Sequence, residues 1–333
     1  MSLAREQAGP GEAEARLQHR LGEWLRSKCD APAAEILSAE PLNGGYTNLT
    51  WRVSARVSGR TFGDDLQFIL RMATEGGVST PDDLPLLAQF DLLKALEPTA
   101  VKAPVPLWFE SDSDILGAQF LTMQPLGGET GPRYFPLDLP DRNERISSFV
   151  RTLRDIHAVD WQAGELERIL TAPKPEHCAQ AALYRVMRCV SSRGLDQHPL
   201  ARRATAWLSE RLPPRSEVAL VHGDSNLSNY RFEKGEVVGV LDWEMAMLSD
   251  PAWDVAFYCG AIPKFYADQS VAVQQGERER FLDSYSSETG RRIDDLPFWE
   301  VLFLLRAASG SQLAAMGDNR TPIYWQRLED LTR

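Results

Sequence analysis

The sequence lacks the long apolar runs of a membrane protein. No stretch approaches the roughly 18–20 apolar residues that a membrane-spanning helix needs, and the first thirty residues hold acidic side chains but no apolar segment of a signal peptide. Cysteine is scarce, at four in 333 residues, and no pair has the spacing of a metal site. We therefore expect no membrane association and a cytoplasmic protein with reduced thiols.

The sequence also lacks an excess of basic residues. Its formal net charge is −11, and this disfavours a nucleic-acid partner, which would require a basic surface. The apolar share of 43% and the charged share of 25% are typical of a soluble globular protein. Two interpretations of the acidity stay open, namely general solubility and an acidic patch that attracts a cationic substrate.

The length and the order of patterns predict two lobes. A chain of 333 residues exceeds the roughly 250–300 residues at which a single core stops growing. After a predicted amphipathic helix over 12–28, the order to residue 125 is β-β-β-α-β-β, with the second helix expected over 82–97. The fold class is therefore α+β, with a small β-rich lobe over 1–125.

The second predicted lobe, over 126–333, is mainly helical, and Pro125–Gly128 forms the connection to it. Short strands interrupt the helices between 217 and 242, with a turn at 233–235. The clearest helical patterns of this lobe cover 141–158, 176–193, 198–211, 281–290 and 298–316.

The segment 218–260 carries the residues that suit phosphoryl transfer. Asp224 follows an apolar strand, Asn229 comes five residues later, and Asp242 ends the next apolar strand. Transfer of a phosphoryl group to an alcohol needs a carboxylate to accept the hydroxyl proton and oxygen ligands for magnesium. By itself, an Asp after a Gly is common in ordinary turns, so the prediction depends on the three residues together.

These residues stand in recognisable motifs. HGDSNLSN matches the kinase catalytic-loop pattern H-x-D-x-x-x-x-N, LDWE stands where protein kinases have DFG, and DPAWD follows. The combination resembles the aminoglycoside phosphotransferase and choline kinase-like superfamily. It is most similar to bacterial phosphotransferases of the type also fused to acyl-CoA dehydrogenases, and LNGGYTNLTWRV, FILRMA and LRDIHAVDW support this. The resemblance runs from about Leu42 to Gly260.

The resemblance implies a bilobal protein-kinase-like fold that uses ATP and Mg²⁺. Asp224 would be the catalytic base, and Asn229 and Asp242 would bind Mg²⁺. His222 would hold the loop, and Asp254 would accept hydrogen bonds from its backbone N–H groups.

Simpler structural roles compete with some of these assignments. Asp250 and Asp254 could be helix caps beside Pro251. His157, inside a predicted helix, is interpreted as a packing residue or as a support of the site.

The nucleotide site is predicted in the first lobe. Gly44 and Gly45 would let backbone N–H groups approach the phosphates, and Thr47 and Asn48 could add side-chain donors. Two glycines between strands are also an ordinary hairpin turn, so that interpretation stays open. Arg71 occupies the place of the usual strand lysine and can bind phosphate oxygens through two donors.

Two further positions complete the nucleotide site by resemblance. The usual partner of the strand cation is a glutamate, but the matching residue is Gln89, which can bond Arg71 without neutralising it. FLTMQPLGG resembles the adenine-binding hinge, where the C=O of Gln124 and the N–H of Leu126 would meet the adenine edge. A surface arginine and a plain edge strand are the respective alternatives.

The predicted function is ATP- and Mg-dependent transfer of the γ-phosphoryl group to an alcohol of a small molecule. Aromatic residues beyond Pro251 could line a pocket for a partly apolar acceptor. Because Arg71 and Gln89 depart from the usual ion pair, a nucleotide-binding pseudokinase that acts as a regulatory or interaction module is the alternative. A protein kinase is disfavoured, because DPAWD follows Asp242 without a long activation segment.

Overall fold

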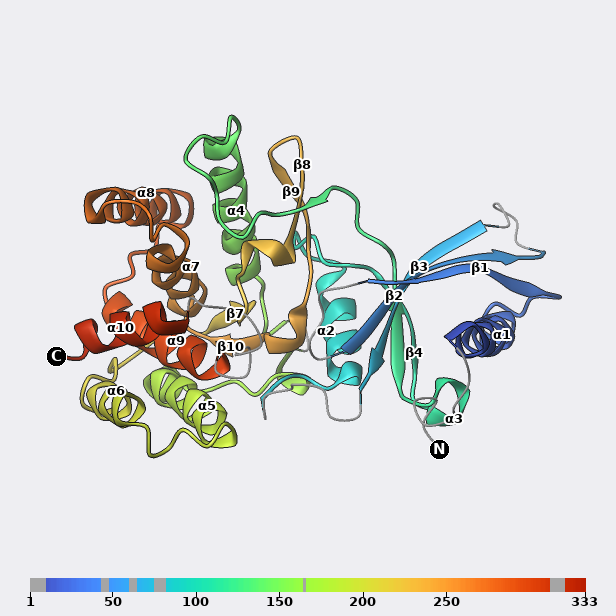
Figure 1. The fold of residues 1–333 in the computed structure, drawn as a ribbon, viewed down its shortest axis with the longest axis horizontal. Coiled ribbons are helices and arrows are strands. Elements are labelled where there is room, and N and C mark those ends of the chain that lie inside the picture. The colour runs from blue at the N-terminus through green and yellow to red at the C-terminus, as the bar shows by residue number, and fades with distance from the viewer. Residues whose placement is uncertain (1–9, 43–47, 60–64, 75–81, 164–165, 312–320) are drawn as a thin grey trace. The chain divides into compact units, whose positions relative to one another are not determined.

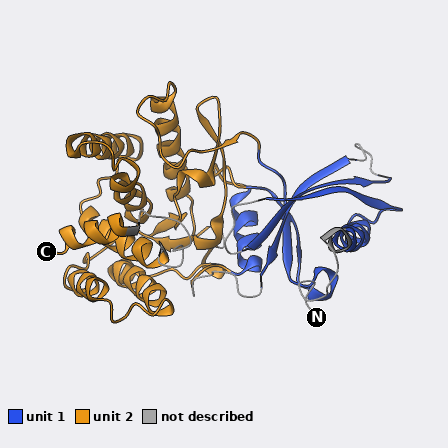
Figure 2. Ribbon diagram, in the orientation of Figure 1, with its two compact units in different colours: residues 1–79, 85–97, 104–126 blue, residues 80–84, 98–103, 127–333 orange. Residues whose placement is uncertain are grey.

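The computed structural model describes residues 10–42, 48–59, 65–74, 82–163, 166–311 and 321–333. The chain forms two compact units (Figure 2). Unit 1 comprises residues 1–79, 85–97 and 104–126, and unit 2 comprises residues 80–84, 98–103 and 127–333.

Unit 1 is built on a five-stranded antiparallel sheet in the order β1-β2-β3-β5-β4 (Figure 1). Its strands are β1 (Ala34–Pro41), β2 (Asn48–Val57), β3 (Asp65–Ala73), β4 (Pro106–Glu110) and β5 (Phe120–Met123). Its helices are α1 (Pro10–Lys28), α2 (Leu86–Leu96) and the single turn α3 (Ser113–Leu116).

The core of unit 1 lies between α1 and one face of this sheet. Leu21 and Leu25 of α1 are fully buried, together with Val53 of β2 and with Phe68 and Leu70 of β3. Successive side chains of a strand point to opposite faces. The buried face therefore carries the odd-numbered residues of β2 and the even-numbered residues of β3, and their neighbours face the other way.

Unit 2 is mainly helical and holds two small sheets (Figure 1). Its helices are α4 (Arg142–His157), α5 (Cys178–Ser192), α6 (Pro199–Glu210), α7 (Ala252–Phe265), α8 (Val271–Thr289), α9 (Leu296–Ser311) and α10 (Thr321–Leu331). Its strands are β6 (Glu129–Thr130), β7 (Ala219–Val221), β8 (Tyr230–Glu233), β9 (Glu236–Val240) and β10 (Met247–Ser249). α7 and α9 are apolar around most of their circumference and pack against each other, as buried helices do.

Most predicted elements are present, with shifts that have local causes. The helix predicted over 82–97 begins at Leu86, because Pro85 disfavours helical backbone at the residue before it. The predicted turn at 233–235 is a tight hairpin, in which Lys234 and Gly235 both have positive φ (49° and 83°). The sequence predicts no range for β1, in which a register shift between Ile36 and Ser38 breaks the alternation of the strand.

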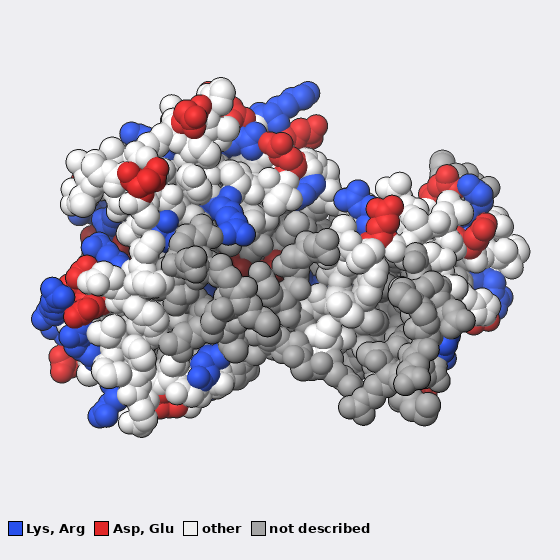
Figure 3. Space-filling view, in the orientation of Figure 1, with Lys and Arg blue, Asp and Glu red and all other residues white. Residues whose placement is uncertain are grey.

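The helices and the surface charge bear on two expectations, namely that the protein has no membrane association and that an acidic patch could attract a cationic substrate. Within the described ranges, no helix has the length and apolar character needed to span a bilayer. Over unit 2, the face seen in Figure 3 shows acidic and basic side chains interspersed. On that face the acidic residues form no continuous patch that would attract a cationic partner.

The thiols provide a test of this packing. Cys178, Cys189 and Cys259 are buried, whereas Cys29 is partly exposed and none forms a disulfide. Burial raises the pKa of the Cys178 thiol to about 11, and burial also raises the pKa of Cys259. Because the thiolate is the reactive form, we expect iodoacetamide at pH 8 to label Cys29 alone in the native protein and all four cysteines in denaturant. Rapid native labelling of any buried cysteine, seen by mass spectrometry, would contradict the fold.

Candidate active site

A buried carboxylate, Asp254, holds the segment before Asp224. Asp254 lies in the first turn of α7 and is fully buried. Its Oδ2 accepts a hydrogen bond from the backbone N–H of His222 (2.8 Å), and its Oδ1 accepts one from the backbone N–H of Gly223 (3.0 Å). Asp250, in contrast, accepts from the backbone N–H of Ala252 (2.8 Å) at the start of the helix. The two aspartates therefore have different contacts, and only Asp254 reaches the loop.

Asp254 is itself held by a histidine from α4. The Nε2 of His157 lies 3.0 Å from Oδ2 of Asp254, and its Nδ1 lies 2.9 Å from the hydroxyl of Tyr285 in α8. Since a carboxylate only accepts, Nε2 donates to it. Burial would raise the pKa of Asp254, but the hydrogen bond from His157 and that from the backbone of His222 outweigh it, so this pKa lies below its ordinary value.

His222 connects two strands of the site. Its side chain is buried, and its Nε2 lies 2.8 Å from the carbonyl oxygen of Leu241, the residue before Asp242. A carbonyl only accepts, so Nε2 carries the proton, and Nδ1 accepts from the backbone N–H of Asp224 (3.3 Å). One imidazole therefore fixes the backbone on both sides of the candidate site.

Gly223 is required by the geometry of this loop. Its φ is +82°, a left-handed conformation that side chains rarely adopt. A Cβ at this position would also overlap the carbonyl oxygen of Met245. Glycine therefore permits the close approach of the Asp224 loop to the segment that follows Asp242.

Asp224 and Asn229 are in direct contact. The Nδ2 of Asn229 donates to the backbone oxygen and to Oδ2 of Asp224, each at 3.0 Å. Burial raises the pKa of the Asp224 carboxyl, and the nearby charge of Asp242 adds to this, while the positive charge of Arg306 opposes it. A carboxylate with a raised pKa is a stronger base than an ordinary aspartate.

Asp242 stands at the end of β9 in an uncommon backbone conformation. Its φ and ψ are 63° and 60°, in the left-handed region. Such conformations concentrate at functional sites. The backbone N–H of Leu241 donates to the carbonyl of Asn229 (2.7 Å), so the strand end and the loop are joined next to Asp242. The structure thus brings Asp224, Asn229 and Asp242 into one place.

The side-chain oxygens of Asn229 and Asp242 suit a magnesium ion. In the part of the chain that the structure describes, no group of three His, Cys, Asp or Glu side chains is arranged to hold a metal ion. Mg²⁺, however, usually keeps several waters and takes substrate phosphates with only one or two protein carboxylates. Both side-chain hydrogen bonds of Asn229 use Nδ2, so Oδ1 remains for a metal. One carboxylate and one amide oxygen therefore fit the predicted ion.

In unit 1, Arg71 and Asn48 form a pair. Both lie on the sheet face opposite α1, on the neighbouring strands β3 and β2. With the Asn48 amide oriented so that its oxygen faces donors, that oxygen accepts from Nη2 (3.1 Å) and Nε (3.2 Å) of Arg71. Gln89 is buried on α2. Gly44, Gly45 and Thr47 lie outside the described residues.

The segment after β5 has free hydrogen-bonding groups at the predicted adenine positions. The backbone N–H of Gln124 donates to the carbonyl of Val105 (2.8 Å). Among the described residues, the C=O of Gln124 and the N–H of Leu126 have no such partner. These are the two groups that the resemblance assigns to adenine.

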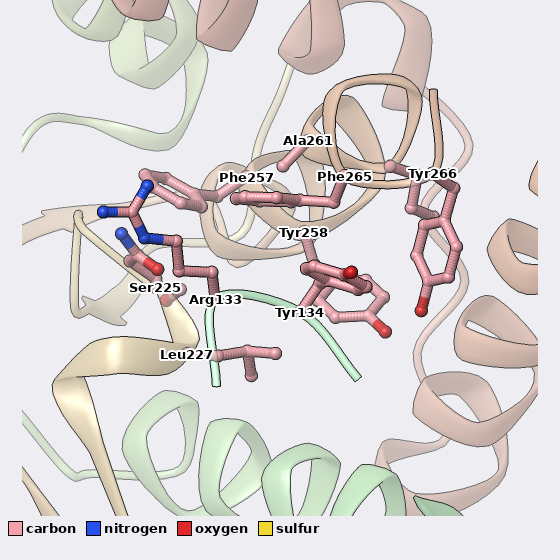
Figure 4. A pocket seen from close by; sticks show the side chains of 11 residues that line it. Arg133, Tyr134, Ser225, Leu227, Phe257, Tyr258, Ala261, Phe265 and Tyr266 are labelled. Atoms are coloured by element: carbon pink, nitrogen blue, oxygen red, sulfur yellow. The ribbon is translucent and has the colours of Figure 1, made fainter. Parts of the chain in front are cut away.

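A recess lined by aromatic residues lies beside the Asp224 loop within unit 2 (Figure 4). Figure 4 shows the rings of Phe257 and Phe265, both from α7, on one side and Leu227 on the other. The hydroxyl of Tyr266 fixes the opposite segment by donating to the carbonyl of Phe135 (2.5 Å). The recess is lined by Arg133, Tyr134, Ser225, Asn226, Leu227, Phe257, Tyr258, Ala261, Ile262, Phe265 and Tyr266. Its single charged side chain is therefore a cation.

The arginines near Asp224 have no role that the sequence predicts. Arg306 interrupts the otherwise apolar run of α9, and Arg185 lies on α5 among the buried residues Ala182, Val186 and Cys189. The signal in the sequence is a positively charged residue within the apolar face of a helix, which indicates a buried or partly buried cation. Helical periodicity cannot say which loop such a cation faces.

Comparison with known sequences identifies the family. The profile of the phosphotransferase enzyme family, APH, matches residues 38–296. The chain belongs to this family. The resemblance drawn from the HGD, DWE and DPAWD motifs is thereby confirmed.

Two curated relatives show how the chain compares with longer proteins. Acyl-CoA dehydrogenase family member 10 of Mus musculus is 32% identical over 232 residues, which are 65% of this chain and 20% of that protein. Acyl-CoA dehydrogenase family member 11 of Gallus gallus is 26% identical over 261 residues, which are 74% of this chain and 32% of that protein. The chain thus spans a fifth to a third of these relatives.

Solved structures of the family share the fold. A candidate aminoglycoside phosphotransferase of Ralstonia eutropha has a TM-score of 0.70 at 19% identity, over 94% of this chain and 95% of its own. Aminoglycoside phosphotransferase APH(4)-Ia, solved with AMP-PNP and hygromycin B, has a TM-score of 0.63 at 16% identity, over 94% and 97%. These matches confirm the predicted kinase-like fold.

The contact between Asp254 and His157 predicts a measurable coupling. Leaving a buried charged group without its hydrogen-bond partner costs about 1–3 kcal/mol or more, so Asp254→Asn and His157→Gln should each lower the free energy of unfolding substantially. The double variant should cost clearly less than the sum of the two. Denaturant unfolding of all four proteins measures this, and additive losses would exclude the coupling.

The lowered pKa of Asp254 predicts acid sensitivity. A carboxyl whose pKa is lower in the folded state stabilises the protein above its unfolded pKa, about 3.9. This contribution is lost as the pH falls through the folded value. We expect the wild type to lose more stability than Asp254→Asn between pH 6 and pH 3. Parallel losses in the two proteins would contradict the lowered pKa.

Proposed function

We propose that this chain transfers the γ-phosphoryl group of ATP to an alcohol of a small molecule, with Mg²⁺. The observation that carries this proposal is the joined set of Asp224, Asn229 and Asp242, on a loop fixed by Asp254. A general base and hard oxygen ligands in one place are the protein groups that phosphoryl transfer requires.

Asp224 is proposed as the base. Its carboxylate accepts the proton of the acceptor hydroxyl while that oxygen forms a bond to the γ-phosphorus. The bond from the γ-phosphorus to the bridging oxygen breaks, and ADP leaves with that oxygen. The raised pKa of Asp224, caused first by burial, suits proton acceptance near neutral pH.

The other groups bind and orient the reactants. Asn229 and Asp242 would hold Mg²⁺, which supplies positive charge to the phosphates. The guanidinium of Arg71, oriented by Asn48, would bind phosphate oxygens. The C=O of Gln124 and the N–H of Leu126 would bind adenine. A fold neighbour was solved with AMP-PNP, and this favours a nucleotide donor.

The aromatic recess supports a partly apolar acceptor. It opens beside Ser225 and Asn226, directly after the proposed base. Aromatic rings bind apolar groups well, and the residues that line the recess include no acidic side chain to pair with a polycation. The family's solved members include a macrolide 2'-phosphotransferase of Brachybacterium faecium.

A nucleotide-binding pseudokinase is the second candidate. It is favoured by one feature of the sequence, namely that Arg71 and Gln89 stand where kinases have the lysine and the glutamate of their ion pair. In this case the nucleotide would regulate binding to another protein.

Nucleotide binding can be tested by thermal unfolding. Saturating Mg·ATP at about 100 times its dissociation constant stabilises a protein by about 2.7 kcal/mol, which should raise the Tm by a few degrees. We expect the rise to require Mg²⁺ and to disappear in Asp242→Ala but not in Asp294→Ala, a change at an exposed aspartate. An unchanged wild-type Tm at millimolar Mg·ATP would contradict both candidate functions.

Turnover separates the two candidates. Loss of a general base costs about 10²–10⁴-fold in rate. We expect Asp224→Asn to keep the Mg·ATP-dependent rise in Tm and to lose ADP release over a panel of hydroxyl compounds. Mass spectrometry of each reaction should find a product heavier by one phosphoryl group in the wild type only. Nucleotide binding without any such product in the wild type would favour the pseudokinase.

A further inference from the structure

Two arginines from different helices converge on Met245, three residues after Asp242. Nη2 of Arg185, in α5, donates to the carbonyl oxygen of Met245 (3.3 Å) and to that of Asp82 (2.9 Å). Nη2 of Arg306, in α9, contacts the sulfur of the same methionine. Both guanidinium groups therefore lie around one residue, although their positions are 121 residues apart in the chain.

Neither arginine has an ion-pair partner among the described residues. The contacts of both use Nη2, and those of Arg185 go to backbone carbonyls. By contrast, Arg188, which is also on α5, pairs with Asp82, and Arg278, on α8, pairs with Glu300. Both side chains are only partly exposed. Two half-buried cations with donors to spare leave room for an anion, since buried charges are normally paired.

This arginine pair lies next to the candidate base. The carbonyl oxygen of Met245, which Arg185 binds, packs against Gly223, and Gly223 directly precedes Asp224. Burial lowers the pKa of Arg185 to about 10, and the positive charge of Arg306 contributes to this, while the negative charges of Asp82 and Asp83 oppose it. Arg306 also acts on Asp224, where its charge opposes the rise of that pKa. The two cations are thus near each other and near the proposed site of transfer.

We propose that Arg185 and Arg306 form an anion-binding subsite for the acceptor, so that the phosphorylated alcohol carries a carboxylate or phosphate group. The inference rests on the proposed function, because it assigns a substrate class to that site. A guanidinium binds either group through two parallel N–H donors. With its negative group held at the arginine pair, the acceptor would present its hydroxyl to Asp224. The arginines are specificity-determining residues.

The subsite can be tested by ligand binding without nucleotide, so that the outcome does not depend on catalysis. The probes are two matched pairs, 3-hydroxypropanoate with propane-1,3-diol and glycerol 3-phosphate with glycerol. Each is added at equal ionic strength, and the Tm is followed over concentration. Arg306→Gln and Arg185→Gln are compared with Arg292→Gln, at an arginine that is 84% exposed. Arg71→Gln reports any binding at the nucleotide phosphates.

We expect at least one anionic probe to raise the Tm and its neutral partner to leave it unchanged. Charged hydrogen bonds contribute about 1.5–3 kcal/mol each, so either arginine variant should weaken binding about ten- to hundredfold. Arg292→Gln and Arg71→Gln should bind as the wild type does. The probe that binds decides between the carboxylate and the phosphate.

Three results would overturn the proposal. They are the absence of any shift with both anionic probes, a shift that survives both arginine variants, and a shift that Arg71→Gln abolishes instead. If Arg306→Gln does not fold, Arg306→Lys replaces it in the test. Lysine keeps the positive charge but lacks the two parallel N–H donors of a guanidinium, so this variant should bind the anionic probe with intermediate affinity. Failure of Mg·ATP to bind, with anion binding intact, would count against the proposed function and leave the subsite standing.

Discussion

The candidate site depends on one buried carboxylate. Asp254 has no exposed surface, and its two oxygens accept backbone hydrogen bonds from the two residues before Asp224. His157 compensates its burial from a third element. Because an unpaired buried charge is costly, this arrangement keeps α4, α7 and the loop together. The loop is therefore placed by the core of unit 2 and not by its own sequence alone.

Polar contacts extend this constraint to the rest of the site. His222 links the loop to the strand end before Asp242, and Asn229 links back to Asp224. Gly223 permits the close approach because it has no Cβ. Asp224 and Asn229 thus hold each other, and His222, which has no role in the proposed reaction, fixes the backbone at Asp224 and before Asp242. Such preorganisation allows a catalytic group to act without rearrangement.

The surroundings of the loop determine what it could act on. Aromatic rings of α7 line the recess beside the Asp224 loop, and the arginine pair around Met245 lies close to Gly223. A phosphotransferase solved with hygromycin B and a macrolide 2'-phosphotransferase share the fold at under 20% identity. The fold is therefore compatible with very different acceptors. The side chains that border the loop distinguish them.

The sequence by itself determined the family, the order of the elements and the motif residues, because these depend on local spacing. HGD, Asn229, DWE and DPAWD fall within 33 residues, and strand and helix periods are read over short windows. The meeting of Arg185 with Arg306 and of His157 with Asp254 was decided only by the tertiary structure. Arg185 and Arg306 are 121 residues apart in the chain, and His157 and Asp254 are 97 residues apart. The periodicity of a single helix or strand does not indicate which helices pack around one loop.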